Sequence, residues 1–98
     1  VGANIQKADL QRANLEGADM AGVKLRNAHL QNANLKKVDL RRADLEHADF
    51  SKANLSSANF TGAKMSDGLF IDADLTGSNM DSADITDAQF KGAIGFKA

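Results

Sequence analysis

The hydrophobic residues of this chain recur at every fifth position. From Ile5 to Phe90, each residue whose number is divisible by five is apolar, which makes an unbroken series of eighteen. We call these the centre positions. A small position lies two residues before each centre and recurs once more at Ala93, and these nineteen positions hold Ala in fifteen cases and otherwise Val, Gly or Ser. Neither set contains a charged residue, although 26% of the chain is charged, so both sets are expected to face an interior.

A five-residue period predicts neither a helix nor a flat strand. A helix advances about 100° per residue and would spread the centre residues around its circumference, and a flat strand would point them to alternate faces. The pattern is satisfied when the chain turns once per pentapeptide. The small residue, the outward residue that follows it and the centre then form a short extended segment, and the next two residues form a corner. The second corner position holds glycine five times, which suits an unusual backbone conformation.

Several segments match the motif A(D/N)LXX letter by letter, among them residues 8–12, 13–17, 33–37 and 53–57. Over about residues 3–93 the chain therefore resembles the pentapeptide-repeat family. The resemblance implies an all-β fold, the right-handed quadrilateral β-helix, in which four pentapeptides form one square coil and about five coils stack. Residues twenty apart are then expected to lie above one another in a rod about 24 Å long. A single domain is expected over residues 1–98, with residues 94–98 as an irregular C-terminal end.

Composition excludes several classes of function. The chain has no cysteine, which removes disulfides, thiolate metal sites and cysteine nucleophiles. The net charge of −1 gives no field that attracts nucleic acid or an anionic membrane. No apolar run has the length of a signal peptide's central segment or of a membrane span, so a cytoplasmic location is expected. The two histidines, His29 and His47, fall in different columns, and we predict no catalytic, cofactor, metal or small-molecule site.

Apolar residues at positions where the repeat has polar ones mark candidate contacts. Leu69 and Ile71 flank one centre residue and are expected to point outward together, either as a small interaction patch or as two incidental exposed residues. Near the end of the chain, Gly95 occupies the next centre position and stops the repeat. Ile94 and Phe96 are expected to fold back over the last coil.

The N-terminal end of the stack is expected to expose an apolar cross-section, formed by Ile5, Leu10, Leu15 and Met20. Solenoids normally cover such an end, because apolar area and unpaired strand edges favour association. Three alternatives remain: a second copy stacks end to end, another protein covers the end, or further sequence precedes the first residue. We carry the first forward as a hypothesis.

These patterns favour a non-enzymatic structural or protein-interaction module whose partner is a protein, with no nucleic acid and no membrane. The alternative follows from the same resemblance, because some pentapeptide-repeat proteins protect DNA gyrase by imitating duplex DNA, a role in antibiotic resistance. A short chain of near-neutral charge is a poor imitation of a phosphate backbone, which disfavours this alternative. The resemblance also points to cyanobacteria, in whose genomes such short repeat proteins are common.

Overall fold

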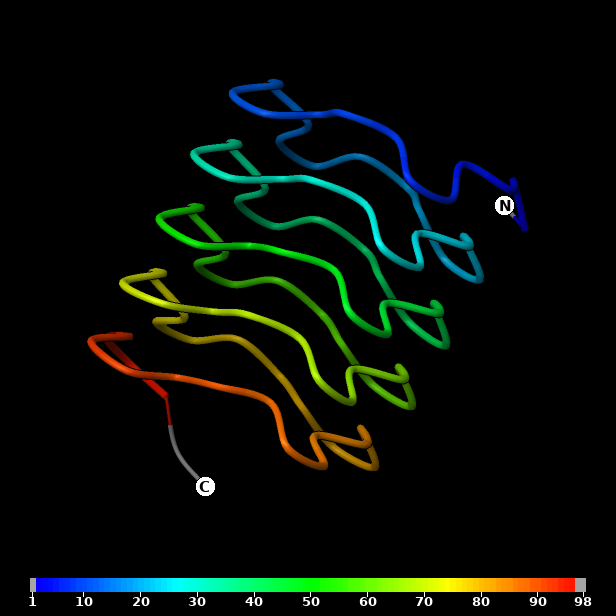
Figure 1. The fold of residues 1–98 in the computed structure, drawn as a ribbon. Helices are drawn as coiled ribbons and strands as arrows, with labels where there is room; N and C mark the ends of the chain where they lie inside the picture. The colour runs from blue at the N-terminus through cyan, green and yellow to red at the C-terminus, as the bar shows by residue number, and fades with distance from the viewer. Residues whose placement is uncertain (1, 97–98) are drawn as a thin grey trace.

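A computed structural model describes residues 2–96, which form a stack of coils along one axis (Figure 1). Over these residues there is no helix and no continuous strand, and the β-structure consists of fifteen isolated parallel bridges. Every bridge joins two residues that are twenty apart, from Asn4 with Lys24 to Asp74 with Ile94. Four pentapeptides therefore make one coil, and the predicted vertical stacking is confirmed.

Backbone hydrogen bonds connect each coil to both of its neighbours. The N–H of Asn34 donates to the carbonyl of Ala13 in the preceding coil, and the N–H of Leu35 donates to the carbonyl of Asn54 in the following coil, both at 2.8 Å. The N–H of each second corner residue that has a following coil also donates to it, as Arg42 does to Thr61 at 2.9 Å. The chain turns after every centre residue, so one side of a coil is too short to form a strand of ordinary length.

The corners are β-turns with one repeated geometry. The carbonyl of each of the eighteen centre residues accepts a hydrogen bond from the N–H three residues later, at 2.9 to 3.1 Å. The second corner residue has φ between +57° and +74° in every turn, as in a type II turn. Five of these residues are glycine, but thirteen are not, including Arg42 and Lys52. Because this conformation costs a non-glycine residue about 1 to 3 kcal/mol, the pairing between coils must impose it.

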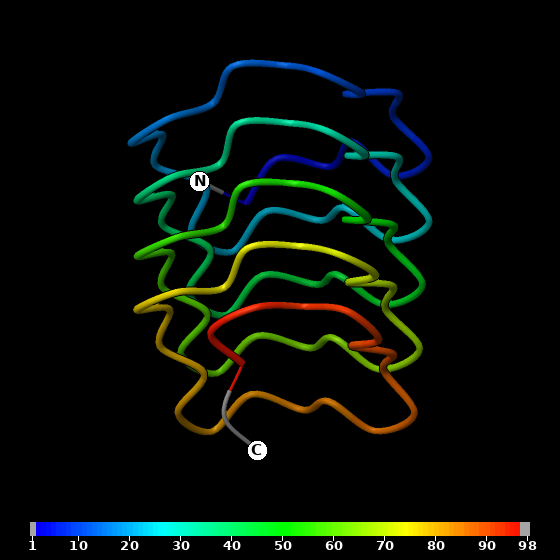
Figure 2. The same ribbon diagram turned by 90° about the vertical axis from the view of Figure 1, so that its left-hand side faces the viewer.

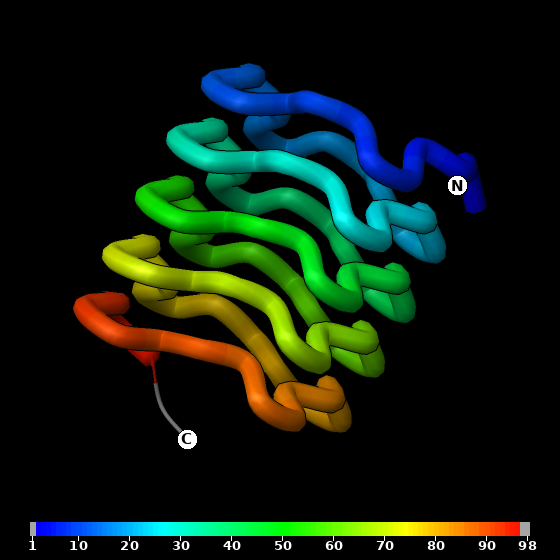
Figure 3. The backbone as a smooth tube through the Cα atoms, in the orientation of Figure 1, coloured from blue at the N-terminus to red at the C-terminus, as the bar shows by residue number. Residues whose placement is uncertain are grey.

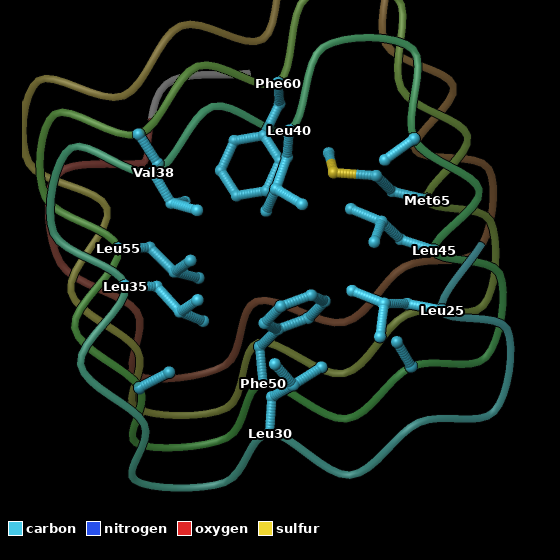
Figure 4. Close-up of a cluster of buried hydrophobic side chains, with 14 of the residues drawn as sticks. Leu25, Leu30, Leu35, Val38, Leu40, Leu45, Phe50, Leu55, Phe60 and Met65 are labelled. Carbon is cyan, nitrogen blue, oxygen red and sulfur yellow. The ribbon is translucent and has the colours of Figure 1, made fainter. Parts of the chain in front are cut away.

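The core is a dry column of centre residues along the axis of the stack. All centre residues from Leu25 to Leu75 have no exposed surface, and the small positions between them are buried. Figure 4 shows centre side chains from all four sides converging on the axis, with Leu25, Leu45 and Met65 on one side. Burying a leucine or phenylalanine stabilises a fold by about 1.5 to 3 kcal/mol. This repeated burial explains why the five-residue period has no exceptions.

Phenylalanine rings stack in one of the four columns. The ring of Phe70 lies parallel to those of Phe50 and Phe90, with both centroid distances at 5.1 Å, and Phe60 meets it edge-on at 6.2 Å. The small position beside this ring is Gly68, where a Cβ atom would lie 3.0 Å from the Phe70 ring. Glycine at this one position therefore makes room for the stacked aromatic ring.

The molecule is a short block. Its principal extents are 29 × 26 × 21 Å, so no dimension dominates, and Figures 2 and 3 show the coils stacked from the first repeats at one end to the last at the other. This agrees with the expected short rod, because fewer than five coils at about 4.8 Å each give a length of about 24 Å, which is similar to these extents.

Candidate interaction surface

Asp and Asn at the outward position have a structural role. The outward residue is Asp or Asn in thirteen of the eighteen repeats that have an apolar centre. In all thirteen, the side-chain Oδ1 atom accepts a hydrogen bond from the N–H of the first corner residue, at 2.9 to 3.3 Å. This bond satisfies a turn N–H that the pairing between coils leaves free. None of the other five outward residues in these repeats, Lys24, His29, Lys64, Leu69 and Gln89, makes this bond.

The five departures from Asp and Asn are confined to two adjacent sides of the block. The first of these sides has Lys24 and Lys64, and the second has His29, Leu69 and Gln89. We call them the Lys24 side and the His29 side. The other two sides, which carry Asn34 and Asp39, keep Asp or Asn in every one of these repeats. On this half of the lateral surface, some outward positions therefore lack Asp or Asn and the turn hydrogen bond that these residues make.

Ion pairs occur both between neighbouring coils and within one coil. At the edge between the Lys24 and His29 sides, Arg26 donates to Asp44 of the next coil at 2.8 Å and lies 3.8 Å from Glu46. The hydrogen bond to Asp44 and the two negative charges raise the pKa of Arg26. On the far half of the surface, Arg41 donates to Asp39 at 2.7 and 2.9 Å, and this contact lowers the pKa of the Asp39 carboxyl.

The structure places Leu69 on the His29 side and Ile71 at the corner where this side ends. Parallel bridges connect Leu69 to Asp49 in the preceding coil and to Gln89 in the following one. Both apolar residues are partly buried. They are the only large apolar residues at outward or first corner positions of the eighteen repeats. Leucine has no oxygen to accept a hydrogen bond, so the N–H of Ile71 lacks the contact made in the thirteen regular turns.

The two C-terminal candidates have different environments. Ile94 continues the ladder, because its carbonyl accepts a hydrogen bond from the N–H of Leu75 at 2.8 Å, and its side chain is 58% exposed. The expectation that Ile94 covers the last coil is therefore wrong, since the register makes residue 94 an outward position. Phe96 does pack on the end of the core, with its ring centroid 3.8 Å from that of Phe90.

Gly95 permits this change of direction between Ile94 and Phe96. It has a φ of +74°, and a Cβ atom at this position would lie 2.5 Å from the Cα of Thr76. Residues 97 and 98, the rest of the expected irregular end, lie outside the described residues.

The four N-terminal candidates belong to consecutive repeats and form one coil end. Ile5, Leu10, Leu15 and Met20 are all partly buried and pack against the core. They lie at an end of the stack, whereas Leu69 and Ile71 lie on a side of it. The N-terminal candidates and the pair Leu69 and Ile71 therefore form two separate surfaces. Ile94 and Phe96 lie at the C-terminal end and belong to neither.

The described residues bring few reactive groups together. His47 Nε2 lies 3.6 Å from Asp67 Oδ2, and both side chains are about half exposed. Within residues 2–96, no three His, Cys, Asp or Glu side chains are grouped as metal ligands. No helix in this part of the chain is long and apolar enough to cross a membrane. Open depressions lie beside Ser78 and beside Arg42, and neither Leu69 nor Ile71 lines them.

Twenty-residue coils with four turns each and a continuous apolar column define a β-helical solenoid protein. A family model described as pentapeptide repeats matches residues 1–36, 28–67 and 58–94, with eight copies. The chain therefore belongs to the pentapeptide-repeat family. Its structural neighbours in that family have a right-handed β-helix as their fold.

Three solved structures show how far the similarity extends. The pentapeptide repeat protein Rfr23 from the cyanobacterium Cyanothece 51142 is 33% identical with a TM-score of 0.90, over 93% of this chain and 63% of Rfr23. The protein alr5209 from Nostoc PCC 7120 is 28% identical with a TM-score of 0.81, over 93% of this chain and 78% of alr5209. HetL from Nostoc sp. strain PCC 7120 is 28% identical with a TM-score of 0.64, over 95% of this chain and 57% of HetL.

The chain thus spans less than two thirds of Rfr23 and of HetL. HetL is described as involved in the regulation of heterocyst differentiation. A comparison with curated protein sequences finds no match to this chain.

Proposed function

We propose that this protein is a non-enzymatic interaction module, a right-handed quadrilateral β-helix that binds a partner protein through its Lys24 and His29 sides. The observation that carries the proposal concerns the eighteen repeats with an apolar centre, in which all five outward departures from Asp and Asn lie on these two adjacent sides. The incomplete last repeat adds Ile94 on the Asn34 side. Each of the five departures gives up a turn hydrogen bond and places a lysine, histidine, leucine or glutamine on the surface instead. Because these lost hydrogen bonds are repeated on one half of the surface, they support the proposal that this half binds a partner.

The architecture suits such a role. The column of buried centre residues and the bonds between coils hold the outward side chains in rows about 4.8 Å apart. A rigid scaffold reduces the conformational entropy that is lost when side chains bind a partner. The regulatory involvement of HetL, a relative at 28% identity, also supports a binding role rather than a catalytic one.

The experiment compares two double variants of equal size. Lys24→Asn with Lys64→Asn restores the regular outward residue on the Lys24 side, while Asn14→Lys with Asn54→Lys introduces two lysines on the Asn34 side. Each immobilised protein is exposed to a lysate of the native host, and captured proteins are quantified by mass spectrometry. We expect the first variant to lose partners that the wild-type protein captures, and the second to retain them. Equal retention or equal loss in both variants contradicts the proposal.

The DNA-mimicking alternative has little support in the surface charge. The net charge is −1, and cations such as Arg26 pair with the carboxylates of the adjacent coil. A DNA mimic needs a sustained negative potential. We therefore expect no inhibition in a gyrase supercoiling assay at micromolar protein, and clear inhibition would favour the alternative.

A second contact is proposed at the end of the stack. The partly buried apolar residues of the first coil, Ile5, Leu10, Leu15 and Met20, support end-to-end association with another copy. Analytical ultracentrifugation at micromolar concentration should then detect a species heavier than the 10.4 kDa chain. A monomer at every concentration rejects this contact and leaves the lateral surface unaffected.

A further inference from the structure

Within the proposed recognition surface, we propose that Leu69 and Ile71 form a docking point for a basic segment of a partner protein that carries an apolar side chain. We call these two residues the Leu69 patch. The inference rests on the proposed function and adds the chemistry of the partner. It is carried by the position of the patch, by its surrounding charges and by the turn bond that Leu69 gives up.

The Leu69 patch is unique among the outward-facing positions of the complete repeats. Elsewhere these outward and first corner positions hold polar or charged residues, apart from Ala21. Leu69 and Ile71 flank the buried centre Phe70 in one coil, with Leu69 on the His29 side and Ile71 at the corner where this side ends. Both remain partly exposed. Together they offer apolar contact for one side chain of a partner.

The charges around the patch are mainly negative. Asp67 precedes Leu69 by two residues, Asp72 follows Ile71 directly, and Asp49 and Asp87 occupy the adjacent coils. Against these four carboxylates stand two lysines in the adjacent coils, Lys52 and Lys91, each joined by a backbone hydrogen bond of 2.9 Å to Ile71 or Asp72. His47 Nε2 lies 3.6 Å from Asp67 Oδ2.

This charge pattern selects among the possible occupants. A second copy placed face to face would bring the same carboxylates together, which is unfavourable. Nucleic acids and anionic lipid surfaces carry the same sign as the rim and would be repelled. A partner segment with lysine or arginine on both sides of an apolar residue matches the acidic rim and the apolar centre at the same time.

The sequence offers a substitution that removes the patch without harming the fold. Leu69→Asn introduces one of the two residues, Asp and Asn, that together occupy the outward position in most repeats, and its Oδ1 atom can accept a hydrogen bond from the N–H of Ile71, as in the thirteen regular turns. The variant should therefore melt at the same temperature as the wild-type protein or higher. The matched control, Asn59→Leu, places a leucine on the Asp39 side, where the two coil neighbours are Asp39 and Asn79.

The test uses two-dimensional NMR of the ¹⁵N-labelled protein with three synthetic pentapeptides. The first has a central leucine between two pairs of lysines, the second has serine in place of leucine, and the third has glutamate in place of lysine. We expect the first peptide to shift the amide signals of residues 67–72 in a saturable, salt-sensitive manner. Leu69→Asn and the serine peptide should each weaken binding by about fivefold or more, as expected for one lost leucine contact. Asn59→Leu should leave the binding at residues 67–72 unchanged.

Several results would overturn the inference. One such result is that the lysine peptide shifts the amide signals of acidic residues over the whole surface. Another is that this peptide binds Leu69→Asn as tightly as it binds the wild-type protein. Another is a preference for the glutamate peptide. Signals of residues 67–72 that depend on protein concentration without peptide would identify a second copy as the occupant. Because the capture experiment with the Lys24 and Lys64 variants leaves Leu69 unchanged, failure here and failure of the proposed function are distinguishable.

Discussion

Replacement of Phe70 by alanine should be among the most destabilising single changes in this protein. The side chain has no exposed surface, lies between two parallel rings at 5.1 Å, and meets a third ring edge-on at 6.2 Å. Truncating a buried phenylalanine to alanine lowers the free energy of unfolding by about 3 to 5 kcal/mol. Each lost aromatic pair adds about 0.5 to 1.5 kcal/mol beyond the buried area. We therefore expect Phe70→Ala to lie at the upper end of that range.

Urea unfolding followed by far-ultraviolet circular dichroism measures this loss. Phe70→Leu keeps an apolar side chain in the column but loses the ring contacts, so its destabilisation should be intermediate. Ile94→Ala is the control, because this side chain is 58% exposed and its truncation should change stability by under about 0.5 kcal/mol. The reasoning is refuted if Phe70→Ala costs less than about 1 kcal/mol, or no more than Ile94→Ala.

Two further predictions concern the core and the turns. Leu35→Asp should prevent folding because it places an unpaired carboxylate on the dry axis, whereas Lys36→Asp at the neighbouring corner should change stability by under about 0.5 kcal/mol. Circular dichroism melts that are alike for the two variants would contradict the inward and outward assignment. The hydrogen bond from the Thr86 hydroxyl lowers the pKa of the Asp84 carboxyl in the folded protein. The ionised carboxylate therefore stabilises the fold above the unfolded pKa of about 3.9, and this stabilisation is lost as the pH falls through the lower folded pKa. Asp84→Asn keeps an acceptor for the turn but does not titrate, so its melting temperature should decline less than that of the wild-type protein between about pH 5 and pH 2. Parallel declines in the two proteins would show that this carboxylate contributes nothing to the acid sensitivity.

The inward positions could be predicted because burial leaves little choice of residue. A charge at Leu35 or Leu55 would be unpaired on the axis, so the five-residue period persists from Ile5 to Phe90. The stacking of residues twenty apart followed once four repeats were assigned to a coil, and the bridge between Asn34 and Asn54 confirms it. The turns were less predictable, because lysine and arginine seldom adopt a positive φ, yet Arg42 and Lys52 do so here.

The candidate surface was predicted only in part. Leu69 and Ile71 are identifiable as apolar residues at polar positions, and the structure places Leu69 on the His29 side and Ile71 at the corner where this side ends. The role of Asp and Asn was not evident, because it depends on a contact between the side chain and a turn N–H two residues later. A count of outward residues by side, after assignment of four repeats to a coil, would have revealed that the Lys24 and His29 sides differ from the other two.

The sequence alone determined which residues form the interior and that the chain must turn every fifth residue, since apolar burial and the exclusion of charge act on each repeat separately. The tertiary structure decided the contacts that depend on neighbouring coils. These contacts impose the positive φ at corners such as Arg42 and include the ion pair of Arg26 with Asp44. They also leave Ile94 exposed and stack the ring of Phe96 on that of Phe90. These features arise from hydrogen bonds and packing between residues about twenty positions apart, which no single repeat encodes.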